Sequence, residues 1–217
     1  MAIERVEKMS RLGIILAGGQ SRRMGTPKAL LRIQGKAVIS TIIEAMSPLC
    51  EQVVISADNQ ELYEFTGLPV VPDQYTGAGP LAGLHAALSY SGQEWNLVCS
   101  CDHPFVSSLL FGGLIAAAEQ AGEEVDAIIP FWEGELQPLA AVYRGRALAR
   151  LADCLENGER RVQDWTSRLN IKQASLEELV DTTGTGWNKA LFNMNNPEDY
   201  EEALRLAESL PSQAELH

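Results

Sequence analysis

The sequence predicts an α/β protein with a Rossmann-like, mostly parallel sheet, one antiparallel strand, and helices on both faces. Apolar runs of strand length alternate with longer segments of helical period, and this alternation indicates a parallel sheet covered by helices. The first run, 13–17 (GIILA), is continuously apolar, as in a strand buried on both faces. The hairpin-like segment 132–135 (WEGE) joins two later runs and therefore turns one strand antiparallel.

The elements follow in chain order. Strands are predicted at 13–17, 52–57, 68–73, 95–101, 125–130, 138–144 and 190–195. Helices are predicted at about 37–46, from Gly79 onward, at 109–121, at 145–169 with a break over 156–161, and at 197–210. The last helix opens with proline and acidic residues, which are typical of a first turn. Because 217 residues suit one large domain, we expect a single domain over 1–217 with an ordered core from about 12 to 210.

Composition narrows the classes of function. The formal net charge is −12, which argues against the sequence-blind attraction that holds DNA or RNA to basic proteins. No segment has the 18 or more apolar residues of a membrane span, and the first apolar run is too short for a signal peptide, so we expect a cytoplasmic protein without a membrane partner. Cys50, Cys99, Cys101 and Cys154 fit no zinc spacing and are expected to be reduced.

Positive charge gathers at one place in this acidic chain. Five cations and no carboxylate lie between residues 22 and 36, after the glycine-rich end of the first strand. A solvated charged face is one interpretation and an anion site is the other. Gly18 and Gly19 allow a phosphate to approach backbone N–H groups at the carboxyl edge of the sheet, where open α/β folds bind ligands. With Arg23 and Lys28, they indicate a triphosphate site.

Two familiar phosphate motifs do not fit this stretch. A Walker loop has four residues between its glycines and then Lys-Ser/Thr, whereas five residues separate Gly19 from Gly25 and Ala29 follows Lys28. The sequence also lacks the G-x-G-x-x-G of dinucleotide-binding folds.

Several motifs together carry a resemblance to a known family. They are LAGG-x-S-x-R-M-G-x-x-K at 16–28, Asp73, GPLAG at 79–83, CDHP at 101–104, GERR at 158–161 and NMNNPED at 193–199. In this order they resemble the sugar-phosphate and cofactor nucleotidyltransferases and, within these, the molybdenum cofactor guanylyltransferase family. The resemblance covers residues from about 12 to 208.

The resemblance implies a single α/β domain of the nucleotidyltransferase type that uses magnesium, joins GMP from GTP to molybdopterin and releases pyrophosphate. By resemblance, the nucleotide contacts are Leu16, Ala17, Gly18, Gly19, Lys28, Ser56, Asp73, Gly79 and Asp102. The catalytic residues are Arg23, Lys28 and Asp102, with magnesium on Asp102. Pterin contacts are expected from Arg160, Arg161, Asn193 and Asn195. Family members often have asparagine where this chain has Ser56, whose side chain has a shorter reach.

The residue types suit such chemistry. Nucleotidyl transfer depends chiefly on positioning and charge neutralisation, and magnesium commonly uses only one or two carboxylates plus phosphate oxygens. Asp102 ends a buried strand and fits that metal role, although it is also placed to cap the next helix. A phosphate nucleophile is largely ionised at neutral pH, so no catalytic base is expected. We therefore expect His103 to lie near the metal and His85 to pack in a helix.

Other functions remain open. The segment 26–31 (TPKALL) is more similar to sister enzymes that transfer CMP to the same pterin, but those have alanine in place of Gly18 and lack the GPLAG and GERR motifs. A cytidylyltransferase and a sugar-1-phosphate nucleotidyltransferase are therefore the alternatives among enzymes. A regulatory nucleotide-binding protein without turnover is disfavoured because both Lys28 and Asp102 are present. Pterin-synthesis proteins or molybdoenzymes are expected as transient partners.

Overall fold

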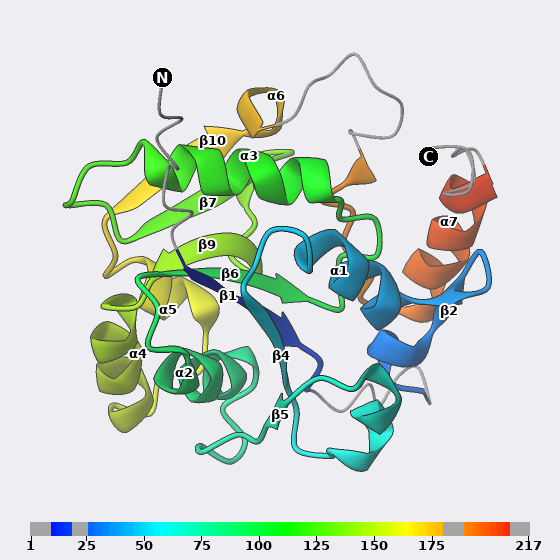
Figure 1. Ribbon diagram of the computed structural model, residues 1–217, viewed down its shortest axis with the longest axis horizontal. Helices are drawn as coiled ribbons and strands as arrows, with labels where there is room; N and C mark the ends of the chain where they lie inside the picture. Colours follow the sequence, from blue (N-terminus) through cyan, green and yellow to red (C-terminus); the bar gives the residue numbers. More distant parts are fainter. Residues whose placement is uncertain (1–9, 19–25, 180–188, 209–217) are drawn as a thin grey trace, which may run out of the picture.

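A single eight-stranded sheet organises the chain (Figure 1). The computed structural model describes residues 10–18, 26–179 and 189–208. The strands are β1 (Arg11–Leu16), β4 (Gln52–Ser56), β5 (Val70–Val71), β6 (Trp95–Ser100), β7 (Ala127–Trp132), β8 (Glu135–Leu136), β9 (Ala140–Arg144) and β10 (Ile171–Ser175). Their order is β10-β7-β9-β6-β1-β4-β5, and β8 pairs with β7.

The pairing confirms a mostly parallel sheet. Strand β1 runs parallel to β4 and β6, β4 is parallel to β5, and β7 is parallel to β10. Strand β9 is antiparallel to both β6 and β7, as the hairpin-like segment predicts, and the short β8 is a second antiparallel piece. Both neighbours of β1 are therefore parallel to it, so three strands end at one edge of the sheet.

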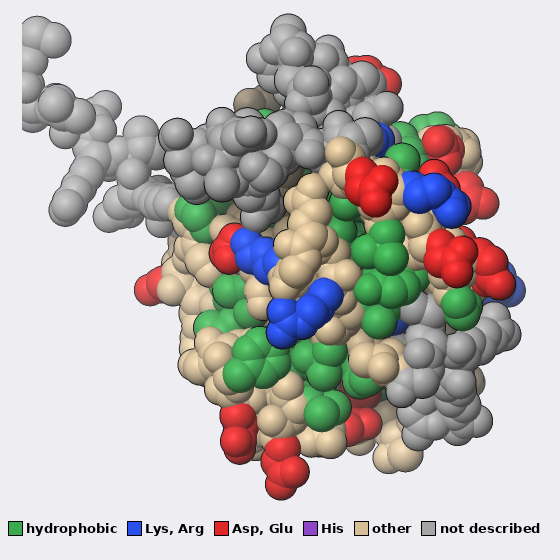
Figure 2. All heavy atoms as spheres, turned by 90° about the vertical axis from the view of Figure 1, so that its right-hand side faces the viewer, with side chains coloured by type: hydrophobic (Ala, Val, Ile, Leu, Met, Phe, Trp, Pro, Cys, Tyr) green, Lys and Arg blue, Asp and Glu red, His purple; other side chains and the backbone are tan. Residues whose placement is uncertain are grey.

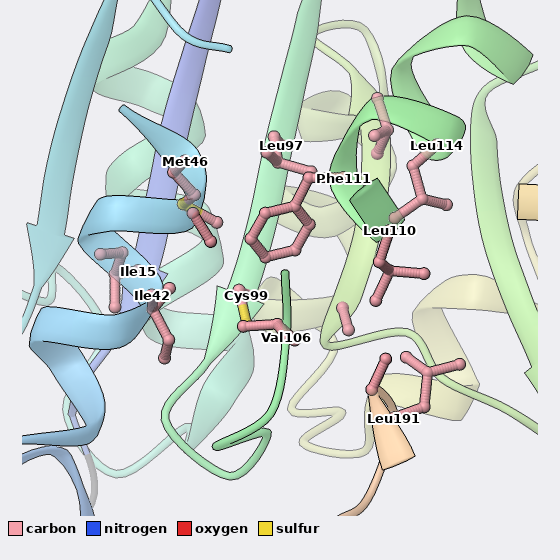
Figure 3. Packing of buried hydrophobic residues seen from close by; sticks show 14 of the residues in the cluster. Ile15, Ile42, Met46, Leu97, Cys99, Val106, Leu110, Phe111, Leu114 and Leu191 are labelled. Atoms are coloured by element: carbon pink, nitrogen blue, oxygen red, sulfur yellow. The ribbon is translucent and has the colours of Figure 1, made fainter. Parts of the chain in front are cut away.

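Helices cover both faces of this sheet (Figure 1). One face carries α1 (Val38–Met46) and α3 (Ser108–Glu119), and the other carries α2 (Pro80–Ser91), α4 (Ala147–Glu156) and α5 (Val162–Thr166). In β1, Ile15 packs into the first hydrophobic cluster, while Ile14 and Leu16 pack into the second. Figure 3 shows the first cluster, where Phe111 and Leu110 of α3 lie beside Leu97 and Cys99 of β6.

Smaller elements complete the described chain. They are the 3-10 helices η1 (Lys28–Leu30) and η2 (Glu61–Thr66), the hairpin β2 (Arg32–Ile33) and β3 (Lys36–Ala37), α6 (Leu176–Leu179) and α7 (Pro197–Glu208). Helix α7 lies against the hairpin, since Tyr200 Oη donates to Arg32 O at 2.8 Å and Gln34 Nε2 donates to Ala207 O at 2.7 Å. Asn196 caps α7 by accepting from Asp199 N at 2.8 Å, as expected of a residue before proline.

Two sequence interpretations need correction. The strand predicted at 190–195 is wrong: the segment is irregular, and it crosses the end of β6, where Met194 N donates to Asp102 O at 2.8 Å. Its apolar residues point into the core without a strand partner, which explains the misleading pattern. Strand β10 was not predicted because Lys172 and Gln173 are exposed, so this edge strand lacks an apolar run.

A buried carboxylate ties three elements together away from this edge. Asp126 accepts hydrogen bonds from Arg146 Nε at 2.6 Å, Arg150 Nη1 at 2.5 Å and Asn170 N at 2.9 Å. Burial tends to raise the pKa of Asp126, but these donors outweigh it and hold the pKa below its ordinary value. Asp126 therefore stays ionised and links β7 to α4 and to the start of β10.

Candidate active site

The carboxyl ends of β1, β4 and β6 meet at one place. In the strand register Leu16 stands opposite Ser56 on one side and Ser100 on the other. Backbone hydrogen bonds continue past the strand ends. Ala17 N and Gly18 N each donate to Ser56 O at 3.0 Å, and Cys101 N donates to Leu16 O at 3.2 Å. This is the edge where open α/β sheets bind ligands.

Lys28 and Asp102 form an ion pair at this edge. Lys28 begins η1, Asp102 follows β6, and Lys28 Nζ lies 2.7 Å from Asp102 Oδ1. Their side chains are 17% and 29% exposed, so the charges are sheltered yet reachable from solvent. Asp102 does not cap the next helix, because Ser107 Oγ accepts from Leu110 N at the start of α3. The structure thus brings together two residues that the sequence places 74 positions apart.

Asn195 joins this pair from the far end of the chain. Lys28 Nζ also donates to Asn195 Oδ1 at 3.3 Å, and the Met194 N to Asp102 O bond fixes the local backbone. Asp199 Oδ2 accepts from Asn195 N at 2.6 Å, which anchors the segment to the start of α7. The sequence predicted Asn193 and Asn195 on one side of a strand; both are exposed around buried Met194, although the backbone is irregular.

Ser56 and Asp73 form a second polar pair beside the backbone that follows β1. Ser56 Oγ donates to Asp73 Oδ1 at 3.4 Å, and Asp73 N donates to Asp58 Oδ1 at 3.3 Å. Burial and then the Asp58 carboxylate raise the pKa of Asp73, while the Ser56 hydroxyl opposes that change. Gly83 of α2 lies directly against the pair, since a Cβ there would stand 2.5 Å from Ser56 Oγ. The absence of a side chain at Gly83 therefore leaves room for the Ser56 hydroxyl.

Tyr63 holds the backbone just after β1. It is the buried residue of η2, and its hydroxyl donates to Ala17 O at 3.0 Å. Burial raises the pKa of Tyr63 to about 12, so the hydroxyl remains a donor over the physiological range. Sequence reasoning missed this residue, because 60–66 (QELYEFT) mixes polar and apolar residues without a clear period.

His85 and His103 behave as packing residues. Burial lowers the pKa of His103 more than the Asp102 carboxylate and the backbone of Phe192 and Leu191 raise it, so the ring is neutral. Burial also lowers the pKa of His85, whose ring meets Tyr75 edge-on at 4.8 Å between centroids. Neither is arranged as a base.

The other predicted residues fall in three places. Gly79 precedes α2 with φ of +60°, a conformation that favours glycine, and it presents the start of that helix to the same edge. Arg160 Nη1 donates to Leu155 O at 3.2 Å and to Glu159 O at 2.9 Å at the end of α4, and Arg161 precedes α5. Gly19 and Arg23 lie outside the described residues.

The oxygens at this edge suit a hard divalent cation. Within 10–18, 26–179 and 189–208, no group of three or more His, Cys, Asp or Glu side chains is arranged to hold a metal ion. Asp102 and Asn195 nevertheless converge on Lys28 Nζ with a carboxylate and an amide oxygen. Magnesium is satisfied by few protein ligands when phosphate oxygens complete its shell, so the residues fit a sparse magnesium site.

The Lys28–Asp102 pair at the carboxyl edge of a mostly parallel sheet indicates a nucleotidyltransferase, an enzyme that transfers a nucleotide from a nucleoside triphosphate. More specifically, the chain belongs to the family of MobA-like NTP transferase domains, whose family model matches residues 13–173.

Named relatives agree with this assignment. The chain is 34% identical over 201 residues to a probable molybdenum cofactor guanylyltransferase of Bacillus cereus, covering 90% of this chain and 96% of the relative. The crystal structure of molybdopterin-guanine dinucleotide biosynthesis protein A from Archaeoglobus fulgidus has a TM-score of 0.77 and 28% identity, covering 92% of this chain and all (100%) of the other. A 2-C-methyl-D-erythritol 4-phosphate cytidylyltransferase from Thermus thermophilus, at 20% identity and a TM-score of 0.66 over 92% of this chain and 100% of its own, shares the fold.

None of the helices in the described part of the chain has the length and apolar character needed to cross a membrane.

Proposed function

We propose that this chain transfers GMP from GTP to the phosphate of molybdopterin, giving the guanine dinucleotide form of the molybdenum cofactor and pyrophosphate. The observation that carries the proposal is the convergence of Lys28, Asp102 and the backbone after β1 at one edge. The family assignment and the relatives named guanylyltransferases support the choice of GTP and the pterin.

In this reaction the protein mainly positions and neutralises charge. The pterin phosphate oxygen forms a bond to the α-phosphorus of GTP, and the bond from that phosphorus to the oxygen bridging to the β-phosphorus breaks, releasing pyrophosphate. Lys28 exchanges its bond with Asp102 for contacts to triphosphate oxygens, where a positive charge is most useful in the transition state. Arg23 is proposed as a second cation on those oxygens, because a guanidinium group can make bidentate contacts with phosphate.

Magnesium is part of the proposal. Asp102 would hold it, with the amide oxygen of Asn195 as a second oxygen donor at the same place. When bound, the ion supplies neutralisation of the phosphate charge. The nucleophile needs no protein base, which agrees with the neutral, buried His103.

The remaining contacts are proposed from the resemblance of the sequence motifs to the family. The backbone from Leu16 to Gly19 is proposed to hold the nucleotide, and Ser56 and Asp73 to bind its base or ribose. On the pterin side we propose Arg160, Arg161, Asn193 and Asn195.

We further propose that the reaction takes place in the cytoplasm, with transient contacts to proteins that supply or receive the pterin. The four cysteines are in the thiol form, which fits a reducing compartment.

The experiment measures pyrophosphate release from GTP, CTP, ATP and UTP, each with and without molybdopterin and magnesium. We expect release from GTP only when both are present. A preference for CTP would overturn the guanylyl assignment in favour of the cytidylyl alternative. Nucleotide binding without release under any condition would support the regulatory alternative.

A matched pair of variants tests the centre itself. Asp102→Asn keeps the shape of the side chain and removes its charge, and we expect turnover to fall by about 100-fold or more. Asp153→Asn makes the same chemical change on the exposed face of α4 and should leave turnover unchanged. Circular dichroism and thermal unfolding of both variants separate loss of chemistry from loss of fold.

A further inference from the structure

The surface made by η2 and the β2–β3 hairpin carries opposite charges on two sides of an apolar centre. We define this dimer face by Arg32 and Lys36 on the hairpin and by Glu61, Leu62, Glu64 and Phe65 on η2. It lies outside the Lys28–Asp102 centre and has no part in the proposed reaction.

The geometry of η2 produces the separation of charge. In a 3-10 helix residues three apart lie above one another on the same side. Tyr63 forms the buried side, so two outward stripes remain. One stripe is apolar, with Leu62 38% exposed and Phe65 62% exposed, and the other is acidic, with Glu61 and Glu64.

In the apolar stripe, Phe65 is turned toward the hairpin. Phe65 lines a hollow of about 730 Å³ together with residues of 30–40, including Arg32 and Lys36. Glu61 and Glu64 line a different hollow with Asp58. The order across the surface is therefore basic, apolar, acidic. Figure 2 shows this face, with Lys and Arg side chains near the centre of the view, hydrophobic ones below them and acidic ones at the lower margin.

The basic side rests mainly on Arg32. Its Nη1 donates to Gly35 O at 2.6 Å, which holds the guanidinium at the hairpin turn, and the residue is exposed. Lys36 pairs with Glu44 of α1, so part of its charge is already offset.

We propose that this face associates with the same face of a second copy of the chain, in a two-fold dimer centred on Phe65. A two-fold interface must be complementary to itself. A face that is basic on one side of an apolar centre and acidic on the other meets that condition, because rotation places Arg32 of each copy opposite Glu64 of the other. A single-sign face would instead repel its own copy.

The size of the face sets the expected strength. One exposed phenylalanine, one half-exposed leucine and two charge pairs are at the small end of specific interfaces, so we expect a dissociation constant of about 10–100 µM. Charge pairs at such a rim are screened by salt, so association weakens as ionic strength rises.

The test is sedimentation velocity of the full-length chain from about 5 to about 500 µM. We expect a monomer–dimer equilibrium for the unaltered chain and a dissociation constant at least about tenfold higher for Arg32→Glu and for Glu64→Arg alone. In an equimolar mixture of these two variants, one chain carries a carboxylate at both positions and the other a guanidinium at both. Each contact across the two-fold axis then joins opposite charges, so the mixture should dimerise again.

Control variants carry the same change of net charge elsewhere. Lys172→Glu on β10 lies at the opposite edge of the sheet, and Glu177→Arg lies on the exposed side of α6; neither should alter the dissociation constant. Recovery in the mixture also excludes misfolding, because unfolded variants would not restore association.

Three results would overturn the proposal. They are an unaltered chain that stays monomeric throughout the range, control variants as disruptive as those on the dimer face, and a mixture that associates no better than its components. A monomeric chain whose dimer face captures a different acidic protein would equally exclude the second copy as its occupant.

Discussion

Replacing Gly83 with alanine tests how closely α2 packs against the groups proposed to bind the nucleotide. A Cβ at this position stands 2.5 Å from Ser56 Oγ, 3.3 Å from Leu16 Cδ2 and 3.5 Å from Asp73 Oδ1. The first distance is too short for any real contact. Ser56 is only 1% exposed, so its hydroxyl has no open space to enter. The helix or the Ser56 side chain must therefore shift.

Two opposing effects decide the free energy of unfolding. Alanine in a helix interior is about 1 kcal/mol more favourable than glycine. Overfilling a packed core costs about 1–3 kcal/mol. Gly83→Ala should therefore be between about 0 and 2 kcal/mol less stable than the unaltered chain. Because the Ser56 to Asp73 hydrogen bond is lost in the shift, the dissociation constant for GTP should rise about five- to tenfold.

The assays are urea unfolding and calorimetric titration with GTP. Gly112→Ala in α3 is the matched control, because a Cβ there meets no atom within 4 Å and the same helix preference should make it about 1 kcal/mol more stable. Adding Ser56→Ala to Gly83→Ala removes the nearest atom and should recover stability without recovering GTP affinity. If Gly83→Ala gains as much stability as Gly112→Ala and binds GTP normally, the close packing inferred at Gly83 is wrong.

Four further changes give distinct outcomes. Lys28→Gln removes the cation beside Asp102 and should weaken GTP binding about tenfold or more in calorimetry, whereas an unchanged affinity would remove Lys28 from the triphosphate site. Asn195→Ala should raise the magnesium concentration needed for half-maximal pyrophosphate release without altering thermal stability by more than about 1 kcal/mol; an unchanged magnesium requirement would contradict its proposed place. Tyr63→Phe loses one buried hydrogen bond and should cost about 1 kcal/mol in urea unfolding, together with weaker GTP binding. Asp126 has a lowered pKa, so its stabilisation is complete above the unfolded value of about 3.9 and is lost as pH falls through the folded value; Asp126→Asn should cost about 2–3 kcal/mol at pH 7 and flatten the acid limb of the stability curve.

The buried strands were predictable because each is a short apolar run of strand length. The residues of β1 and β6 are all buried, so mostly apolar runs mark them in the sequence. Strand β10 escaped detection for the opposite reason, since an edge strand with exposed Lys172 and Gln173 carries no such run. The segment 190–195 misled the prediction because Leu191 and Met194 are buried where the irregular chain crosses the sheet edge, so a short apolar run occurs without a strand.

The site was predictable in part. The ends of two buried strands predicted that the backbone after β1 and Asp102 lie at one edge, because parallel strands end at the same edge. The contacts among the polar groups depend on segments that are far apart in the sequence, and a local sequence pattern does not predict such contacts. Asn195 contacts Lys28 across 167 positions, and Tyr63 contacts Ala17 from a 3-10 helix that was not predicted from the sequence. Local patterns therefore predicted which edge of the sheet carries the candidate site, whereas tertiary packing determines which side chains contact one another there.

The position of the candidate active site follows from the core itself. In β1, Ile15 faces one hydrophobic cluster and Leu16 faces the other, so a slip of one residue would turn each toward the wrong layer. The same register places Leu16 opposite Ser56 and Ser100, and thereby sets Asp102 beside the turn after β1. The burial energy that fixes the strands thus also fixes how the ends of β1 and β6 lie beside each other. The geometry of the candidate site is therefore a consequence of how the central strand is packed, and the loops add contacts to an arrangement that the sheet has already set.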